Sequence, residues 1–213
     1  MNPLTRTLCV LAVLVTGLSG CGGLSRPYPE KSLHALDVGS PEKSEAAKGT
    51  HVLKVENVWV ADPFSALTFN YKVGESKFTS DYYNGFIAPP GRMLTGNLSS
   101  WLAASGIFSA VVSGENSADY DFVLETNVTA LYGDYSDSKS PLAVIEAKFF
   151  LIDESGGRFV IAFQKQYREN EPISAISPDE LVRGWDRGYR RMLESLSADL
   201  SKVSIVQGAA AER

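Results

Sequence analysis

Histidine and cysteine are scarce in this sequence of 213 residues, which contains two of each. Metal and redox sites draw mainly on these residue types, so neither kind of site is expected. The sequence also lacks the G-x-S-x-G nucleophile turn, the P-loop, the H-E-x-x-H zinc motif and the dinucleotide fingerprint. Neither His34 nor His51 lies in a catalytic motif. We therefore predict a protein that is not an enzyme and has no cofactor or metal.

Positive charge is also in short supply. The chain has 20 Lys and Arg against 25 Asp and Glu, which gives a net charge of −5 and a pI near 5.1. A nucleic-acid-binding protein would need a basic stripe, so no nucleic-acid partner is expected. The 44% of hydrophobic residues suffice for one sizeable core, and a second full domain is not expected at this length.

The apolar run near the N-terminus is too short to span a membrane. It covers the 11 residues from Leu8 to Leu18, whereas a spanning helix needs about 20. Arg6 is the only charged residue before it, and small residues follow it. A positive start, a short apolar run and a small-residue cleavage site are typical of a secretory signal. We predict that residues 1–20 are a signal peptide that is removed.

Leu18-Ser19-Gly20-Cys21 resembles the bacterial lipobox, a leucine and two small residues before a cysteine. The resemblance implies that the Cys21 thiol is acylated, with chains such as palmitate, and that the signal is cut just before it. An ordinary signal followed by an unmodified cysteine is the alternative. Cys9 leaves with the signal, so the mature chain is expected to have no disulfide. Gly22, where an aspartate would favour inner-membrane retention, favours the outer membrane, unless it only belongs to a Gly22-Gly23 leader.

The mature chain is expected to form one α+β domain over residues 32–206, after a tether at 21–31 and before a flexible tail at 207–213. The predicted sheet is mostly antiparallel and is covered by two helices. Alternation of apolar residues predicts strands at 33–38, 52–60, 67–73, 77–80, 108–112, 121–131, 142–152 and 159–163. In the second strand, Leu53, Val55 and Trp59 are expected on one face.

Helical spacing predicts the two helices. One covers 92–105, with Trp101 on its apolar face and Gly106 as its stop. The other begins after Ser177 as N-cap, has Glu180 placed for a capping box, and runs for about 25 residues. Trp101 and Trp185 are expected in the core. The series Arg183, Arg187, Arg190 and Arg191 is either a solvated face or a surface for an acidic partner.

The order of motifs in residues 69–112 resembles the ABC-type transport auxiliary lipoprotein family, which includes the lipoprotein of the paraquat-inducible system. The motifs are Phe69-Asn70-Tyr71-Lys72, Phe78 to Phe86, Ala88-Pro89-Pro90-Gly91-Arg92-Met93-Leu94, Trp101-Leu102 and Gly106 to Val112. The resemblance implies a non-enzymatic auxiliary component of an ABC transporter that works with an MCE-domain protein. Such systems move phospholipid or other hydrophobic molecules between the two membranes, and the lipoprotein would lie at the outer membrane, facing the periplasm.

Other functions remain open at this point. One alternative is an envelope assembly or structural lipoprotein that supports an outer-membrane protein. Another is a membrane-tethered enzyme of unknown type. The sequence leaves the transported cargo open, as well as direct lipid binding by the domain. It is compatible with a homo-oligomer.

Two short segments are candidate partner-binding residues. Asp81, Tyr82 and Tyr83 combine aromatic rings with polar tips, which suits an interface. Phe86, Pro89 and Pro90 belong to an apolar segment that either contacts a partner or packs over the helix that it precedes.

Overall fold

The computed structural model describes residues 30–41, 49–114, 119–156 and 159–203. The chain divides into two compact units, Met1–Glu30 and Lys31–Arg213, and every element below belongs to the second. The predicted signal peptide, Cys21 and the tail from Gln207 lie outside the described residues. Within the described part, no helix has the length and apolar character that a membrane crossing requires.

Three long strands form the antiparallel part of a nine-stranded sheet, as predicted. They are β7 (Phe122–Asp134), β8 (Leu142–Asp153) and β9 (Val160–Pro172). β8 pairs with β7 on one side and with β9 on the other, each along nearly its whole length. Along these strands, alternate residues are apolar and face the helices, and the polar residues of the pattern lie on the opposite face. This alternation is typical of an antiparallel sheet with one solvated face.

The other edge of β7 carries short parallel strands, so the sheet is not purely antiparallel. β2 (Val52–Val55), β3 (Trp59–Val60) and β4 (Thr68–Lys72) line this edge in turn. β6 (Ala110–Ser113) runs parallel to β2, and β1 (Ser32–His34) runs parallel to β5 (Phe78–Phe86). The hairpin of β4 and β5 is antiparallel. The sheet is therefore mixed.

The predicted strand at 52–60 is divided in two. Leu53 and Val55 are buried as expected, but the core resumes at Val58 and Val60, while Trp59 is 53% exposed. A step of three residues from Val55 to Val58 moves the alternation by one position. A shift of one residue turns every following side chain to the other face, so placing Trp59 beside Leu53 and Val55 was wrong.

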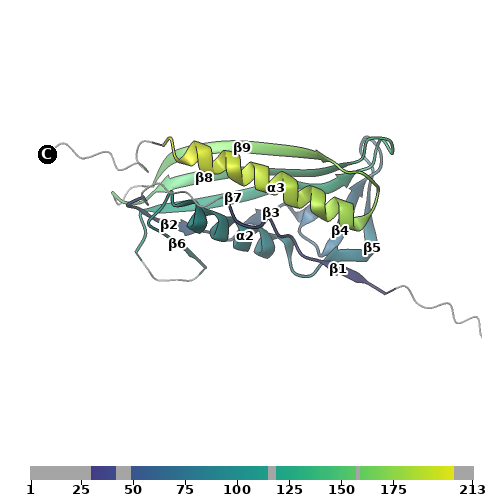
Figure 1. Ribbon diagram of the computed structural model, residues 1–213, viewed down its shortest axis with the longest axis horizontal. Coiled ribbons are helices and arrows are strands. Elements are labelled where there is room, and N and C mark those ends of the chain that lie inside the picture. The colour runs from purple at the N-terminus through teal and green to yellow at the C-terminus, as the bar shows by residue number, and fades with distance from the viewer. Residues whose placement is uncertain (1–29, 42–48, 115–118, 157–158, 204–213) are drawn as a thin grey trace, which may run out of the picture. The chain divides into compact units, whose positions relative to one another are not determined.

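Two helices, α2 (Pro90–Ser105) and α3 (Pro178–Leu200), lie on the same face of the sheet (Figure 1). The short 3₁₀ turn η1 (Asp62–Phe64) precedes β4. α2 ends at Gly106, whose φ of 74° is favourable for glycine. The apolar stripe of α3 is buried in full, and consists of Leu181, Trp185, Tyr189, Met192, Leu196 and Leu200.

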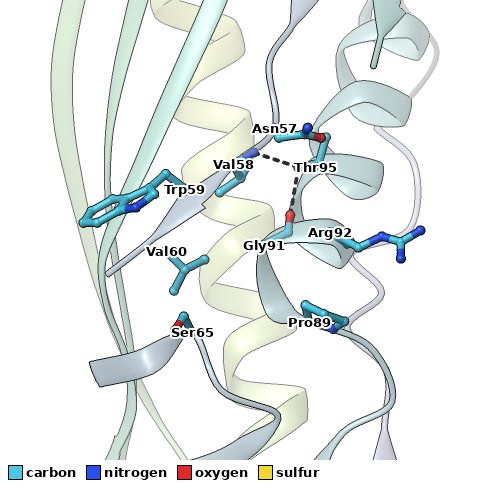
Figure 2. Close-up of a pocket in the computed structure, with 9 residues that line it drawn as sticks. All are labelled: Asn57, Val58, Trp59, Val60, Ser65, Pro89, Gly91, Arg92 and Thr95. Carbon is cyan, nitrogen blue, oxygen red and sulfur yellow. Dashed lines mark hydrogen bonds between the residues drawn. The ribbon is translucent and has the colours of Figure 1, made fainter. Parts of the chain in front are cut away.

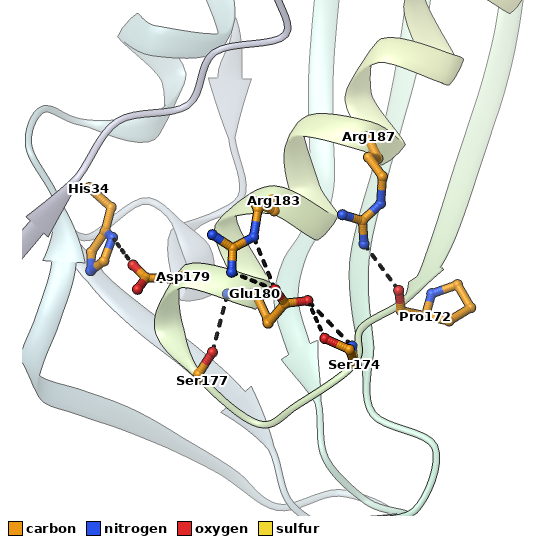
Figure 3. A network of polar contacts seen from close by, with 8 residues as sticks. All are labelled: His34, Pro172, Ser174, Ser177, Asp179, Glu180, Arg183 and Arg187. Atoms are coloured by element: carbon orange, nitrogen blue, oxygen red, sulfur yellow. Dashed lines mark hydrogen bonds and ion pairs between the residues drawn. The ribbon is translucent and has the colours of Figure 1, made fainter.

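The start of α3 agrees only in part with the predicted capping box. The Glu180 N–H donates to Ser177 Oγ at 3.3 Å, as expected of an N-cap. The Glu180 carboxylate does not return this contact in the structure. It accepts hydrogen bonds from the N–H and Oγ of Ser174 and pairs with Arg183 (Figure 3).

The core joins both helices to the sheet. Trp185 Nε1 donates to the carbonyl of Val144 at 3.1 Å, and Trp101 Nε1 donates to Ser197 Oγ at 3.1 Å. Both tryptophans are buried, as predicted. The Tyr189 hydroxyl donates to the carbonyl of Leu94 at 3.2 Å and so connects α3 to α2.

Candidate functional site

The predicted partner-binding residues lie where β5 leads into α2, and the structure divides them into buried and exposed groups. Phe86 is 2% exposed, and its ring centroid lies 4.7 Å from that of Phe69 and 5.4 Å from that of Trp185. Pro90 is the first residue of α2 and is also buried. These two residues belong to the core, because no surface of theirs is open to a partner.

The Asp81 carboxylate is bound within its own segment. It accepts from the Tyr71 hydroxyl at 2.6 Å, from the N–H groups of Tyr83 and Asn84 at 2.8 and 3.0 Å, and from Asn84 Nδ2 at 2.9 Å. Burial alone would raise the pKa of Asp81, but the hydrogen bonds from Tyr71, Asn84 and the backbone outweigh it and lower the pKa. Asp81 therefore orders the middle of β5, and its oxygens are already engaged.

Tyr82 and Tyr83 are exposed, and so are two aliphatic side chains at the same edge of the sheet, Leu33 on β1 and Ile87 directly after β5. Their rings lie edge to face at 5.1 Å, and the side chains of Leu33, Tyr82, Tyr83 and Ile87 are 59%, 59%, 41% and 61% exposed respectively. Leu33 pairs with Gly85 in the sheet, and the Ile87 N–H donates to the carbonyl of His34 at 2.8 Å. We call Leu33, Tyr82, Tyr83 and Ile87 the tyrosine surface. Lys31 Nζ lies 4.6 Å from the centre of the Tyr82 ring.

Pro89 is exposed and lies at an open hollow of about 390 Å³ (Figure 2). We call this cavity the Pro89 hollow. It lies between β3, the segment after η1 and the first turn of α2. The residues that line it are Asn57, Val58, Trp59, Val60, Ser65, Pro89, Gly91, Arg92 and Thr95.

The polar groups on the inner side of the Pro89 hollow are paired with one another. Thr95 is 8% exposed, and its Oγ1 accepts from the Val58 N–H and donates to the Gly91 carbonyl, both at 2.8 Å. A Cβ at Gly91 would lie 2.6 Å from the Val58 carbonyl oxygen, so glycine is what allows α2 to begin this close to β3. The valine, proline and tryptophan side chains thus provide a mainly apolar lining.

Trp59 and Arg92 are exposed and flank the Pro89 hollow, pointing away from each other in Figure 2. Neither residue was predicted from the sequence to bind a partner. Alternation predicted Trp59 on the same strand face as Leu53 and Val55, and the structure interrupts that alternation. Arg92 was regarded only as the start of a helix, although its position directly after Pro89-Pro90-Gly91 was a usable signal.

Two exposed arginines of α3 contact an acidic residue of the neighbouring strand. Glu171 on β9, whose side chain is 4% exposed, pairs with Arg191 and lies 3.6 Å from Arg187 Nε. Arg187 also donates to the carbonyl of Pro172 at 3.1 Å (Figure 3). These pairs join α3 to β9, and all four arginines of the series are exposed, as a solvated face predicts.

The titratable side chains form no recognised catalytic arrangement among the described residues. His34 Nδ1 lies 3.5 Å from Asp179, and His51 Nδ1 lies 3.4 Å from Asp121. The two pairs lie far apart, because β1 pairs with β5 while His51 precedes β2 beside the start of β7. No group of three His, Cys, Asp or Glu residues in this part of the chain could hold a metal ion.

Comparisons with known proteins show the fold. No family model and no curated protein matches the chain. The protein XCC0632 from Xanthomonas campestris, which carries the family-model name DUF330, has a TM-score of 0.69 and 17% identity, covering 78% of this chain and 92% of that one. An uncharacterized protein has a TM-score of 0.62 at 17% identity, covering 80% and 99%. CT253 from Chlamydia trachomatis has a TM-score of 0.50 at 11% identity, covering 74% and 98%.

Proposed function

We propose that this chain is a lipid-anchored envelope protein that serves as a non-enzymatic auxiliary subunit of an MCE-type ABC transport system. Its anchor would be acylated Cys21, and Gly22 favours the outer membrane. Support comes from the lipobox-like segment and from the order of motifs in residues 69–112. In this proposal the domain acts through protein contacts, and its partner is the MCE-domain protein or the transporter.

The observation that carries the proposal is the Pro89 hollow, because it is built from one of the motifs that support the resemblance. Pro89, Gly91 and Arg92 all belong to that motif and all line the cavity. Tryptophan and arginine are the residue types that contribute most often to binding energy at protein interfaces. The paired polar groups around Thr95 leave an apolar lining, so an apolar side chain of a partner can enter without stranding a buried donor or acceptor.

Crosslinking in intact cells tests this assignment. A photo-reactive amino acid would replace Trp59 or Arg92. Gln164, which is exposed on β9, would serve as the control position. We expect an MCE-domain protein to be recovered by mass spectrometry from positions 59 and 92 and not from 164. Recovery of only β-barrel proteins would favour the alternative of an envelope assembly lipoprotein, and recovery of no transport component would contradict the proposal.

Substitutions at the Pro89 hollow should weaken the complex without unfolding the domain. Trp59 and Arg92 are exposed, so we expect Trp59→Ala and Arg92→Ala to change the free energy of unfolding by less than about 1 kcal/mol. At a central interface position each should weaken binding by about 2 kcal/mol, or roughly 30-fold. Phe159→Ala is the matched control, since Phe159 is 81% exposed and lies at the opposite end of the sheet. Equal recovery of the partner with all three variants would exclude the hollow as the docking site.

A further inference from the structure

Exposed apolar side chains are concentrated at one end of the sheet. Among the described residues, eight of the twelve large exposed apolar side chains lie on β1, on the β4–β5 hairpin or on the adjacent loops. They are Leu33, Leu67, Val73, Phe78, Tyr82, Tyr83, Ile87 and Ile176. Three of the other four, Phe159 to Ile161, lie at the opposite end, beside the start of β7 and the end of β8. Figure 1 shows β1, β4 and β5 gathered at one end.

This end is also where the chain arrives from the predicted anchor. Lys31 lies ten positions after Cys21, and β1 begins at Ser32. Ten residues extend at most about 35 Å, so the tether limits how far β1 can lie from the acylated cysteine. The tyrosine surface starts at Leu33 and is thus held close to any bilayer that contains the acyl chains.

The chemistry of the tyrosine surface suits a lipid interface. Tyrosine rings are favoured at the headgroup level because one end is apolar and the other is polar. Leu33 and Ile87 add aliphatic side chains, and Lys31, which lies over the Tyr82 ring, can keep its charge in water while its stem covers apolar surface. The nearest acid of the strand, Asp81, is already satisfied by four hydrogen bonds.

We propose that the tyrosine surface rests on the bilayer and orients the domain, with Leu33 and Ile87 at the acyl boundary and the two tyrosine rings among the headgroups. This inference rests on the lipid anchor of the proposed function. It assigns to lipid the two tyrosines for which the sequence predicted a protein partner. The acyl chains supply the affinity, because a few side chains on an acidic protein would not hold it at a membrane alone. The Pro89 hollow remains available to the transport partner.

Fluorescent labelling of the acylated mature protein in vesicles tests the inference. Tyr83→Cys, Ile87→Cys and the control Phe159→Cys would each supply one thiol for an environment-sensitive dye, since Cys9 leaves with the signal and Cys21 is acylated. The vesicles would contain phosphatidylethanolamine with a minor share of phosphatidylglycerol, and part of the lipid would carry a quencher near the headgroup. All three sites are exposed, so normal thermal unfolding should confirm that the variants fold.

We expect the dye at positions 83 and 87 to shift its emission to shorter wavelength and to be quenched, and the dye at 159 to do neither. Equal signals at all three positions, on protein that floats with the vesicles, would overturn the inference and leave the anchor intact. Protection of position 83 in cells but not in vesicles would also overturn it, in favour of a protein partner. Failure of the protein to float would remove the anchor itself, whereas recovery of the MCE-domain protein is measured separately and can fail independently.

Discussion

At the residue scale, Asp81 shows that a polar side chain in an exposed segment can serve the fold. Its sequence setting, between a serine and two tyrosines, suggested a contact with a partner. The structure instead places four donors around the carboxylate, two of them backbone N–H groups of the same strand. No local pattern of apolar residues could have predicted this, because the Tyr71 donor comes from the neighbouring strand.

We predict that Asp81→Asn destabilises the domain by about 1–3 kcal/mol. The NH₂ group of asparagine would face the hydrogen-bond donors that now surround the carboxylate. Because the pKa of Asp81 is lowered by folding, its contribution is complete above the usual value of 3.8 and is lost as the pH falls through the folded value. Urea unfolding at pH 7 measures the difference. Glu75→Gln, in the exposed β4–β5 turn, is the control. Equal unfolding of Asp81→Asn and wild type would show that the carboxylate is not engaged.

Asp186 on α3 gives a pH dependence of the opposite sign. Its Oδ1 accepts from the Asp37 N–H at 2.9 Å and so holds the segment after β1 against α3. Burial, aided by the charge of Asp37, raises the pKa of Asp186 to about 6, although the Asp37 N–H, Arg190 and Arg187 act against it. Since the folded pKa lies above the usual 3.8, the folded state binds more protons than the unfolded state between pH 3.8 and about 6. The protein therefore becomes less stable as the pH rises through that range.

We therefore predict that Asp186→Asn equals wild type near pH 4 and exceeds it by about 1–2 kcal/mol at pH 7, a figure reduced for solvent screening. Asparagine keeps an oxygen for the Asp37 N–H and removes only the charge. Asp186→Ala also removes the hydrogen-bond acceptor, so its gain in stability over wild type at pH 7 should be smaller. The test is thermal unfolding of all three proteins across this pH range, and a constant gap between Asp186→Asn and wild type would refute the assignment.

At the element scale, α3 depends on glycine for its approach to the sheet. A Cβ at Gly184 would lie 2.5 Å from Ala143 Cβ and 2.8 Å from Ile173 Cγ2. Gly188 is similarly close to side chains of β8 and β9, with several contacts at 3.2 Å. The missing side chains allow the buried stripe of α3 to lie directly on the strands, at the entropic cost that glycine brings to a helix.

We predict that Gly184→Ala destabilises the protein by about 1–3 kcal/mol through overpacking, despite the better helix propensity of alanine. Gly96→Ala in α2 is the matched control, because a Cβ there meets nothing within 4 Å. It should stabilise the protein by about 0.5–1 kcal/mol. Chemical unfolding of both variants separates the two effects, and a stabilised Gly184→Ala would show that α3 does not lie so close to β8.

Local patterns predicted the elements whose partners are close in sequence. The meander of β7, β8 and β9 follows from alternation and turns, and α3 follows from its cap and its apolar stripe. The parallel pairs were not predictable in this way, because Leu53 pairs with Phe122 across 69 residues and nothing local encodes that register. The strand at 52–60 was misjudged for the same reason: its division into β2 and β3 follows the edge of β7.

The candidate site was predictable in position but not in orientation. The residues from Asp81 to Pro90 cover most of β5, the loop after it and the first residue of α2. Which side chains face inward depends on contacts from α3, since Phe86 is buried against Trp185 about a hundred residues later. Trp59 lines the Pro89 hollow because the strand is broken between β2 and β3, and neither composition nor periodicity predicts that break.

At the scale of the whole molecule, two neighbouring surfaces have different proposed tasks. The tyrosine surface lies at the end where the tether arrives, and the Pro89 hollow lies beside α2, where a partner can reach it. A domain held by its lipid anchor needs little further affinity to take a fixed orientation, because the acyl chains already keep it at the membrane. Both assignments depend on Cys21.

The most direct measurement is therefore mass spectrometry of the N-terminal peptide of the protein isolated from the cell envelope. The account predicts a peptide that begins at Cys21, lacks residues 1–20 and carries the added mass of acyl chains, and that Cys21→Ser releases the protein from the membrane fraction. An unmodified Cys21, or a mature chain that retains residues 1–20, would contradict the lipid anchor and the two surface assignments that depend on it.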